Sequence, residues 1–425
     1  MEHVLGLRCT ICGAEYGVDD VAYVCPRHGN DGILDVVYDY DLVRRRFAAQ
    51  PPAVPSMWRY LPLLPVSRQA AQPLVQATVL ETVGWTPLYP APRIAAQLGL
   101  QALWVKDDSR QPTASLKDRA SAVAVVKARE QGAAVVTTAS TGNAGAALAG
   151  LCAAVEQRNV ILVPRTAPPA KVAQLVAFGS TVLLVDGSYD QAFDLCLQVA
   201  QSWGWYNRNT AYNPYMAEGK KTAAYEICEQ LGGAGRFRAP DVIVVPVGDG
   251  CIIGGVHKGL RDLAALGQID RIPRLVGVQA AGSASLVDAW ERGIAGWEME
   301  AIDAHTVADS ICAGLPRDRN KALRAVRETG GAMLRVDDAE ILAAIPALAR
   351  GCGVFAEPAA AAVYAGLVHA VEKGIVSAHD EAVLLITGSG LKDVASVMKG
   401  QSRTPAVVEP TLAAVEKALD GSVAR

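Results

Sequence analysis

A single amine, that of Lys117, stands where the backbone disfavours a cation. Lys117 follows the turn Pro-Thr-Ala-Ser and opens the run KDRASAVAVVKAREQ, whose composition predicts a helix. The positive end of the helix dipole lies at this amino terminus, so a charged ammonium group is unfavourable there. The same field moves the amine toward its neutral form, which is a nucleophile and a proton carrier. A solvated surface lysine would normally sit late in a helix, among other charges.

A glycine-rich turn is predicted between a strand and a helix in DVIVVPVGDGCIIGGVHKG. Its members are Gly248, Asp249, Gly250, Cys251 and Ile252. Backbone amides at such a turn, added to a helix amino terminus, form an anion cradle suited to phosphate. A dinucleotide-binding fold would place an acidic residue after the next strand, but that strand ends in Gln279, and no P-loop Gly-Lys-Ser/Thr follows. The turn alone leaves a phosphate cradle and simple close packing equally open.

Two further loops follow predicted strands. The first contains Ser140, Thr141, Gly142 and Asn143, whose hydroxyls and amides can bind a carboxylate or a phenolic oxygen. Helix capping by Ser140 or Thr141 is the better explanation when that loop is taken alone. In the second loop, Thr387 ends a strand before Gly-Ser-Gly, and its hydroxyl can face a ring nitrogen or belong to an ordinary strand end. This loop does not match the nucleophile elbow, because threonine occupies the position of its first glycine.

Near the amino terminus, two pairs of metal-ligand residues have the same spacing. Cys9 and Cys12 form CTIC, Cys25 and His28 form CPRH, and twelve residues separate the pairs. Two such knuckles bring four ligands to one tetrahedral point, which suits zinc. The role would be structural, because so small a module has too little core to fold unaided. A degenerate ribbon that no longer holds metal is the alternative, which His28 in place of a fourth cysteine keeps open.

The elements that position these residues alternate between β-branched strands and alanine-rich helices. The predicted strands are AVVTT, NVILV, TVLLV, DVIVVPV, RLVGVQ and AVLLIT, all buried in character. Such alternation predicts an α/β architecture with largely parallel sheets. We divide the chain into a zinc-ribbon-like module (1–35), a proline-rich connector without regular structure (36–80), a large domain (81–114 and 215–405), a smaller mobile domain (115–214) and a C-terminal helix (406–425).

Composition narrows the class of protein. The chain has 425 residues, 51% of them hydrophobic and 20% charged, which is enough for two or three domains. A net charge of -3 with interspersed signs favours neither a nucleic-acid nor a membrane partner, and the apolar runs are shorter than the roughly 20 residues of a spanning helix. The start has no signal-peptide pattern, and most of the nine cysteines lie in apolar surroundings, so we expect a cytoplasmic protein with reduced thiols.

Taken in order, these motifs resemble those of the fold-type II pyridoxal-phosphate enzymes of the tryptophan synthase β-like family, and more narrowly those of the threonine synthases. The resemblance includes GWTPLYPAPRIAAQLGL, WVKDDSRQPTASLKDRAS, YNPYMAEGKKTAAYEI and FAEPAAAAVYAGL, and the CTIC...CPRH ribbon also occurs in that family. It covers nearly the whole chain. It implies two open twisted parallel-sheet domains with pyridoxal 5′-phosphate between them, a homodimer, and conversion of O-phospho-L-homoserine and water to L-threonine and phosphate.

The resemblance also implies a role for each motif residue. Lys117 would form the Schiff base with the cofactor aldehyde and later shuttle protons. Asn143 would contact the phenolic oxygen, and Thr387 would face the pyridine nitrogen. The glycine-rich turn from Gly248 to Ile252 would hold the cofactor phosphate. The substrate carboxylate would lie against Ser140, Thr141 and Gly142.

The chain departs from the family pattern at two places. The phosphate turn, often Gly-Asn-Gly-Gly-Asn, here reads Gly-Asp-Gly-Cys-Ile, so Asp249 would stand near a phosphate unless its carboxylate points away. Many threonine synthases carry a basic residue where this chain has Thr181. If that residue grips the substrate phosphate, another must replace it here. The candidates are Arg165, Lys171, Asn213, Lys220 and Lys221, of which Asn213 and Lys221 are our predicted substrate-binding residues.

That gap leaves other functions of the same fold open. A β-replacing enzyme acting on O-phosphoserine would keep Lys117 and the loops but need a shorter pocket. A serine or threonine dehydratase would need no second phosphate site. A ribbon-bearing binding protein on a decayed enzyme scaffold is the non-catalytic alternative, and it would hold no chromophore that borohydride could attach to Lys117.

Overall fold

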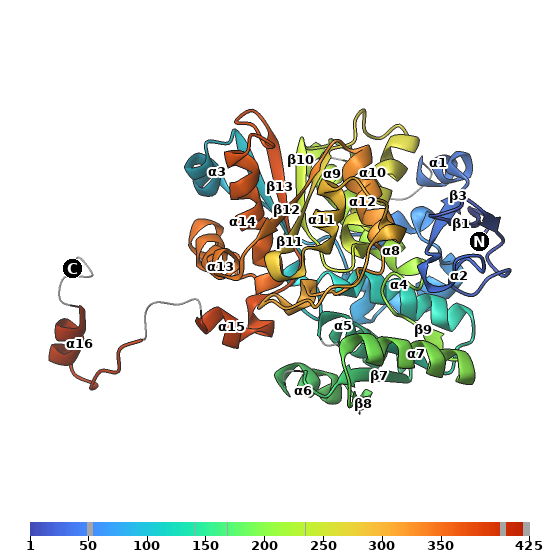
Figure 1. Ribbon diagram of the computed structural model, residues 1–425, viewed down its shortest axis with the longest axis horizontal. Helices are drawn as coiled ribbons and strands as arrows, with labels where there is room; N and C mark the ends of the chain where they lie inside the picture. Colours follow the sequence, from blue (N-terminus) through green and yellow to red (C-terminus); the bar gives the residue numbers. More distant parts are fainter. Residues whose placement is uncertain (49–53, 141, 168, 234, 400–404, 420–425) are drawn as a thin grey trace.

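The computed structural model describes residues 1–48, 54–140, 142–167, 169–233, 235–399 and 405–419. The strands in these ranges form a three-stranded, a six-stranded and a four-stranded sheet. Figure 1 shows the six-stranded sheet in the centre, the four-stranded sheet below it and the amino-terminal sheet on the right. Within the described ranges, no helix combines the length and the apolar character needed to cross a bilayer.

The amino-terminal sheet is antiparallel, with the order β2-β1-β3. Its strands are β1 (Val4–Cys9), β2 (Glu15–Tyr16) and β3 (Leu34–Tyr38). The predicted module ended at residue 35, but β3 continues to Tyr38. Leu34, Val36 and Tyr38 are buried and belong to the hydrophobic core shared with the large domain. The module is therefore docked on the main body of the protein.

The connector contains regular structure, contrary to the sequence prediction. It holds α1 (Tyr40–Ala48), the 3-10 helix η2 (Met57–Leu63) and α2 (Arg68–Val75). Ser67 caps α2 by accepting a hydrogen bond from the amide of Ala70 at 3.2 Å. Met57 and Leu63 are fully buried. Burial of apolar side chains thus outweighs the proline content, although Pro62 lies inside η2 and Pro73 inside α2, where each removes one backbone donor.

The six-stranded sheet has the order β12-β11-β10-β13-β5-β4. Its strands are β4 (Leu88–Pro90), β5 (Ala102–Asp107), β10 (Val242–Pro246), β11 (Arg274–Ala280), β12 (Ala332–Val336) and β13 (Glu381–Ile386). All neighbours are parallel except β4, which pairs antiparallel with β5 at the edge. Val242 and Val244 of β10 enter one core, and Ile243 and Val245 enter the other. Both faces of this sheet are therefore covered, as a parallel sheet requires.

Helices form the two covering layers. One layer contains α3 (Pro92–Leu98), α13 (Asp338–Cys352) and α14 (Pro358–Glu372). The other contains α8 (Tyr215–Lys220), α9 (Thr222–Gly232), α10 (Cys251–Ala265), α11 (Ser285–Glu291) and α12 (Arg319–Glu328). Figure 1 shows these two layers on opposite sides of the central strands. The predicted α/β architecture is confirmed in this part of the chain.

The four-stranded sheet is parallel throughout, with the order β8-β7-β6-β9. Its strands are β6 (Val136–Ala139), β7 (Asn159–Pro164), β8 (Thr181–Val185) and β9 (Tyr206–Asn207). Its helices are α4 (Lys117–Glu130), α5 (Asn143–Ala154), α6 (Pro169–Ala177) and α7 (Tyr189–Trp203). The prediction of a buried β8 was wrong. Leu183 and Leu184 are 45% and 55% exposed, because β8 is an edge strand with little covering it.

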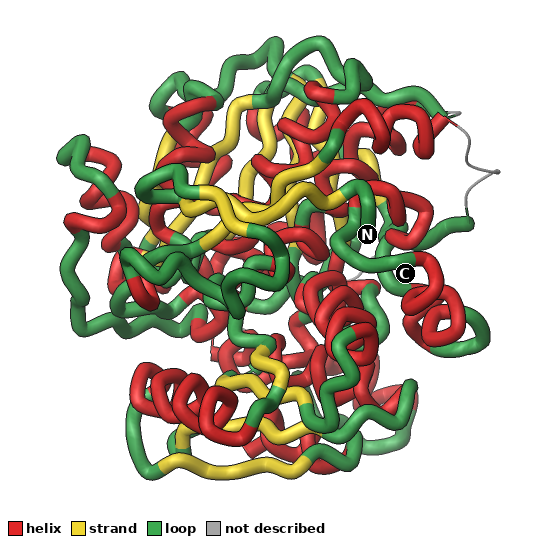
Figure 2. Tube along the Cα trace, turned by 90° about the vertical axis from the view of Figure 1, so that its right-hand side faces the viewer, coloured by secondary structure: helices red, strands yellow, loops and turns green. Residues whose placement is uncertain are grey.

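Short 3-10 helices and the carboxyl terminus complete the description. The 3-10 helices are η1 (Gly29–Asp31), η3 (Val79–Thr82), η4 (Asp108–Arg110), η5 (Ala281–Ser283), η6 (Gly296–Glu298), η7 (Asp309–Ile311) and η8 (Gly390–Lys392). The last helices are α15 (Val394–Lys399) and α16 (Leu412–Leu419). α16 is shorter than the predicted 406–425 helix, whose residues 420–425 lie outside the described ranges. In Figure 2 the two parallel sheets lie one above the other.

Candidate active site

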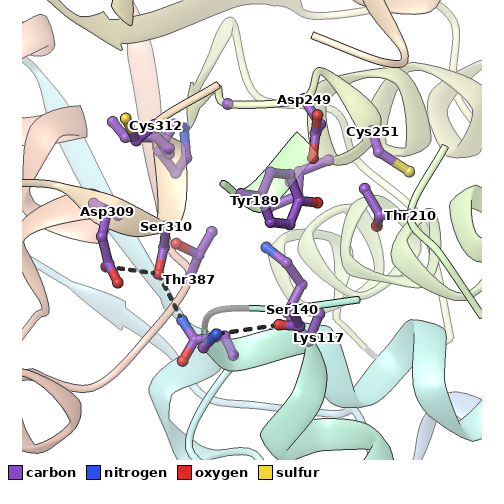
Figure 3. A pocket seen from close by; sticks show the side chains of 18 of the residues that line it. Lys117, Ser140, Tyr189, Thr210, Asp249, Cys251, Asp309, Ser310, Cys312 and Thr387 are labelled. Atoms are coloured by element: carbon purple, nitrogen blue, oxygen red, sulfur yellow. Dashed lines mark hydrogen bonds between the residues drawn. The ribbon is translucent and has the colours of Figure 1, made fainter. Parts of the chain in front are cut away.

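A cavity of about 340 Å³ lies where the carboxyl ends of strands from the two parallel sheets meet. Ser140 follows β6 and Arg208 follows β9 of the four-stranded sheet, while Gly248 and Thr387 follow β10 and β13 of the six-stranded sheet. Open parallel sheets bind their ligands at this edge. Figure 3 shows side chains from both sides converging on the cavity, with Lys117 near its centre.

Lys117 is the first residue of α4, and its side chain extends into the cavity (Figure 3). The amide of the preceding Leu116 donates a hydrogen bond to the carbonyl of Thr387 at 2.9 Å, which fixes the start of α4 against the large domain. Within the described residues the Lys117 amine has neither a hydrogen-bond partner nor an ion-pair partner. Burial, together with the positive charges of Lys220 and Arg208, lowers the pKa of Lys117 to about 8. Much of this amine is therefore neutral near pH 8.

Asn143 begins α5 and pairs with a buried carboxyl group. Its amide nitrogen donates to Oε1 of Glu357 at 2.7 Å and to Oγ of Ser310 at 3.4 Å. Its amide oxygen is buried and has no hydrogen-bond partner among the described residues. Burial, with the negative charge of Asp309, raises the pKa of Glu357 to about 7. The cavity wall thus carries an unpaired amide oxygen beside a carboxyl group that titrates near neutral pH.

The glycine-rich turn before α10 has little room for side chains. A Cβ atom on Gly248 would lie 2.8 Å from Cα of Ile311, and Gly250 has a φ of +86°, which favours glycine. α10 begins directly after Gly250, so first-turn amides without intrahelical partners lie at the cavity wall. The cavity is lined by all five residues of the predicted turn, namely Gly248, Asp249, Gly250, Cys251 and Ile252.

Asp249 brings a negative charge to this turn, as the sequence predicted. One of its carboxylate oxygens accepts a hydrogen bond from the amide of Arg317 at 3.3 Å. Burial raises the pKa of Asp249, while the positive charges of Arg317, Lys220 and Lys117 oppose that rise. Cations from three segments therefore offset the carboxylate, which would otherwise repel a phosphate at the turn.

The loop after β6 serves both capping and the cavity wall. The hydroxyl oxygen of Ser140 accepts hydrogen bonds from the amides of Gly142 at 3.1 Å and Gly145 at 2.9 Å, so the capping role that the sequence allowed is present. Ser140 and Gly142 also line the cavity. Thr141, the third predicted carboxylate-binding residue, lies outside the described residues.

Two residues predicted to bind substrate are not part of the cavity wall. Asn213 is buried, and its amide nitrogen donates to the carbonyl of Asn207 at 2.7 Å, so it holds the segment before α8 in place. Lys221 is fully buried and forms ion pairs with Glu218 at 2.5 Å and Asp262 at 2.9 Å. Local packing accounts for both side chains, and neither is assigned to the substrate.

The other candidates for holding a substrate phosphate differ in whether they line the cavity. Among the described residues, only Lys220 of that group lines the cavity. Arg165 is exposed and forms a surface ion pair. Lys171 pairs with Asp309 and lines a second hollow of about 330 Å³. Thr181 begins the exposed strand β8 and is not part of the cavity wall. A basic residue at position 181 would therefore not bring a charge to the cavity as Lys220 does.

Arg208 and Glu357, both almost fully buried, are among the residues of the cavity wall that sequence reasoning missed. Arg208 donates from Nε to Oγ of Ser121 at 3.1 Å, but Nη1 and Nη2 have no partner in the described chain. No sequence pattern separates a buried arginine after a two-residue strand from an exposed one. Glu357 precedes Pro358 at the start of α14, and its position in the FAEP segment was the only signal that could have found it.

The ribbon brings three of its four predicted ligands together. The Sγ atoms of Cys9, Cys12 and Cys25 lie within 4.8 Å of one another, and those of Cys12 and Cys25 are 4.0 Å apart. Zn–S bonds of about 2.3 Å in a tetrahedron place sulfur atoms roughly 3.8 Å apart, so the thiols fit zinc. His28 is not in that group, although its Nε2 is buried without a hydrogen-bond partner among the described residues.

Known proteins resemble this chain along most of its length. Residues 79–388 match the family described as "Pyridoxal-phosphate dependent enzyme". The chain is 39% identical over 416 residues to the threonine synthase of Methanosarcina acetivorans, and the match covers 98% of each. It is 35% identical over 405 residues to the threonine synthase of Methanocaldococcus jannaschii, covering 95% of this chain and 96% of that one.

Solved structures share the fold at lower identity. The processed form of threonine deaminase isoform 2 from Solanum lycopersicum has a TM-score of 0.63 and 22% identity, covering 78% of this chain and 92% of that one. Maize serine racemase has the same TM-score and identity, covering 79% and 96%. At this identity the likeness shows a common arrangement of the two parallel sheets and does not distinguish between reactions.

Proposed function

Because the chain belongs to the pyridoxal-phosphate-dependent enzymes and, within them, to the threonine synthases, we propose that its cavity converts O-phospho-L-homoserine and water to L-threonine and phosphate. Its cofactor is pyridoxal 5′-phosphate, and its class is the carbon–oxygen lyases. The observation that carries the proposal is the amine of Lys117. It has a pKa of about 8 and no partner in the described chain, and it lies at the head of a helix between two parallel sheets.

The residues around Lys117 fit this cofactor. The cofactor needs an amine for its aldehyde, a polar partner for its phenolic oxygen and an anion site for its phosphate. Lys117 supplies the amine, and Asn143 supplies an amide whose oxygen has no partner in the described part of the chain. The turn at Gly248 and Gly250 excludes side chains and leaves backbone amides at the head of α10. Thr387 adds a hydroxyl to the same wall, where we assign it to the ring nitrogen.

The chemistry divides between the cofactor and Lys117. When bound, pyridoxal phosphate supplies an aldehyde for the amino group of the substrate and a ring that withdraws electrons from its α-carbon. Nζ of Lys117 removes the α-proton and then a β-proton of the substrate, for which a pKa of about 8 is well suited near neutral pH. Ser140 and Gly142 hold the substrate carboxylate, because they line the cavity at the start of α5.

Water must stay away from the reacting carbon until the phosphate has left. Lys171 of α6 forms an ion pair with Asp309 of η7, so a contact already joins the smaller domain to the larger one beside the cavity. We propose that the four-stranded sheet with α5, α6 and α7 moves as a unit against the large domain, and that this ion pair holds the closed arrangement in which the substrate reacts.

The experiment that tests the function is a panel of four substrates. Purified protein with added cofactor is given O-phosphohomoserine, O-phosphoserine, threonine or serine, and phosphate, threonine and keto acid are assayed. The proposal requires equal amounts of phosphate and threonine from O-phosphohomoserine. Phosphate release from O-phosphoserine alone would indicate a β-replacing enzyme, and keto acid from serine or threonine would indicate a dehydratase. Absence of any bound chromophore would favour a binding protein.

We further propose a structural zinc ion in the ribbon, held by Cys9, Cys12 and Cys25 with His28 as the fourth ligand. The clustering of the three thiols supports this ion, and so does Nε2 of His28, which is buried without a hydrogen-bond partner in the described ranges. Elemental analysis should find one zinc per chain, and Cys9→Ser should remove the zinc while leaving the cofactor absorbance in place. We also propose a homodimer that works in the cytoplasm with reduced thiols. Sedimentation should give twice the mass of the chain, and thiol titration of denatured protein freed of zinc should find nine free cysteines.

A further inference from the structure

Arg208 carries a guanidinium group that the described protein does not satisfy. Its side chain is 0% exposed and lines the cavity. Nε donates to Oγ of Ser121 at 3.1 Å, but Nη1 and Nη2 have no hydrogen-bond partner among the described residues, and these two atoms hold four of the five N–H donors. Buried charged donors without acceptors are strongly destabilising. The working enzyme is therefore expected to place an acceptor there.

Two ammonium groups share the cavity with this guanidinium. Lys117, Arg208 and Lys220 all line the wall, and the positive charges of Lys220 and Arg208 help to lower the pKa of Lys117. Like charges held together in a buried site repel one another. An anion that carries more than one negative charge would turn this repulsion into attraction.

The surroundings of Lys220 favour a phosphate group. Its Nζ donates to Oγ1 of Thr210 and to Sγ of Cys251, both at 2.8 Å. Cys251 is the first residue of the 15-residue helix α10, so the ammonium group of Lys220 lies at the amino-terminal end of that helix. The helix dipole attracts anions to this end. Figure 3 shows Thr210 and Cys251 together on one side of Lys117. A guanidinium fork, an ammonium and a hydroxyl offer more donors than one carboxylate accepts, whereas a phosphate dianion accepts them all.

We propose that Arg208 and Lys220 form a binding site for a phosphate monoester dianion in this cavity. The inference rests on the proposed function, because the cofactor and the proposed substrate are both phosphate monoesters. The site explains how a turn that carries the carboxylate of Asp249 can still hold phosphate. It also gives the cavity a basic pair that a residue at position 181 could not supply, because Thr181 is not part of the cavity wall. The 5′-phosphate of the cofactor and the phosphate of the substrate present the same chemistry to these side chains.

A purely structural role for Arg208 would rest on its bond to Ser121. That bond uses one N–H of the five, and glutamine could make it without bringing a charge into the cavity. The structural role and the binding role therefore make different predictions for Arg208→Gln and Ser121→Ala. The first variant removes the charge, and the second removes the bond while keeping the charge.

The first test uses inorganic phosphate as the probe and full-length protein freed of cofactor. Calorimetric titration should find that Arg208→Gln weakens phosphate binding by about 10- to 100-fold, the size expected for a lost charge-assisted pair. Ser121→Ala should bind phosphate as the unmodified protein does. Arg165→Gln, which removes an exposed charge outside the cavity, is the matched control and should also bind normally. Unchanged affinity in Arg208→Gln, or an equal loss in Arg165→Gln, would overturn the proposal.

A second test identifies the source of the phosphate by comparing pyridoxal 5′-phosphate with pyridoxal, which lacks that group. If the cofactor occupies the site, Arg208→Gln weakens pyridoxal 5′-phosphate binding by about 10- to 100-fold and leaves pyridoxal binding unchanged. If the substrate occupies it, both forms bind normally and KM for the phosphorylated substrate rises. Equal weakening of both forms, with normal phosphate binding, would assign Arg208 a structural role and contradict the site.

Melting temperature and circular dichroism verify that each variant is folded. Should Arg208→Gln fail to fold, Arg208→Lys decides the matter, because it keeps the charge and loses the two-pronged donor. An affinity for inorganic phosphate about tenfold lower with a normal melting temperature would support the site, and unchanged affinity would contradict it. Phosphate binding requires no turnover, so failure of this site and failure of the proposed reaction give different results.

Discussion

Arg119 and Arg208 are both fully buried, and they differ in their partners. Arg119 donates to the carboxylates of Asp108 and Glu226 through four hydrogen bonds of 2.5 to 2.8 Å. Arg208 donates to Ser121 alone among the described residues. Burial by itself would lower the pKa of Arg119, but Asp108 and Glu226 raise it well above its ordinary value. Burial lowers the pKa of Arg208 to about 10.

The difference in partners indicates a different role for the buried charge of each arginine. Around Arg119 the donors are matched by acceptors, and Lys106 joins the same network by donating to Glu226 at 2.7 Å. This network ties α4 to α9 and to the segment after β5, so it serves the fold. Arg208 lies in a cavity, and its terminal nitrogens have no partner among the residues that the structure describes. Matched donors indicate a structural role, and free buried donors in a cavity indicate a ligand.

Breaking the matched network should have the largest effect on stability. Arg119→Met would leave Asp108 and Glu226 buried without their main partner, so the free energy of unfolding should fall by about 3–5 kcal/mol. Urea denaturation followed by circular dichroism measures it. Arg110→Met, which removes an exposed arginine nearby, is the control and should change stability by less than about 1 kcal/mol. Similar losses in the two variants would contradict the structural role assigned to Arg119.

The positive charges around Lys117 should affect the pH dependence of the rate at which the protein captures its cofactor. Only a neutral amine attacks an aldehyde, so the capture rate of pyridoxal phosphate by cofactor-free protein should fall about tenfold per pH unit below about pH 8 and level off above it. Stopped-flow absorbance gives this profile. Arg208→Gln removes a positive charge near Lys117, so the pKa of Lys117 should rise. The pH at which the capture rate levels off should therefore move higher. A rate that keeps rising well above pH 9 in the unmodified protein would contradict the lowered pKa.

The smallest effect sharpens the comparison. Arg208→Met removes a buried charge that the protein itself pairs poorly, so the free energy of unfolding of cofactor-free protein should change by no more than about 1 kcal/mol, or should rise. The same urea titration used for Arg119→Met measures this. A loss of about 3 kcal/mol or more would place Arg208 in the same structural class as Arg119.

The sequence predicted the parts of the site that lie at strand ends. The carboxyl ends of parallel strands gather at one edge, and the structure places Lys117, Asn143 and Thr387 on one cavity. The sequence predicted site residues poorly where membership of the cavity wall depends on the direction of a single side chain. Lys220 and Lys221 are neighbours, and side chains about 100° apart around a helix point to different surroundings. Lys220 therefore lines the cavity while Lys221 enters a buried ion cluster.

Burial was the other quantity that composition could not supply. The segment around Arg208 offers no periodic pattern, and an arginine is ordinarily exposed, so its place in the cavity depends on tertiary contacts such as its hydrogen bond to Ser121 of α4. The converse holds for Leu183 and Leu184, whose apolar segment predicted a buried strand. Their strand β8 lies at the edge of its sheet, and the order of strands in a sheet is not readable from one strand.

The central claim concerns the amine of Lys117 and is tested most directly by borohydride reduction of the cofactor-loaded protein, followed by peptide mass spectrometry. The account predicts one pyridoxyl group per chain, attached to Lys117. It also predicts that Lys117→Ala takes up no label and loses turnover by at least about 10³-fold, without rescue by Lys117→Arg. A label on another lysine such as Lys220, or turnover retained in Lys117→Ala, would contradict the account.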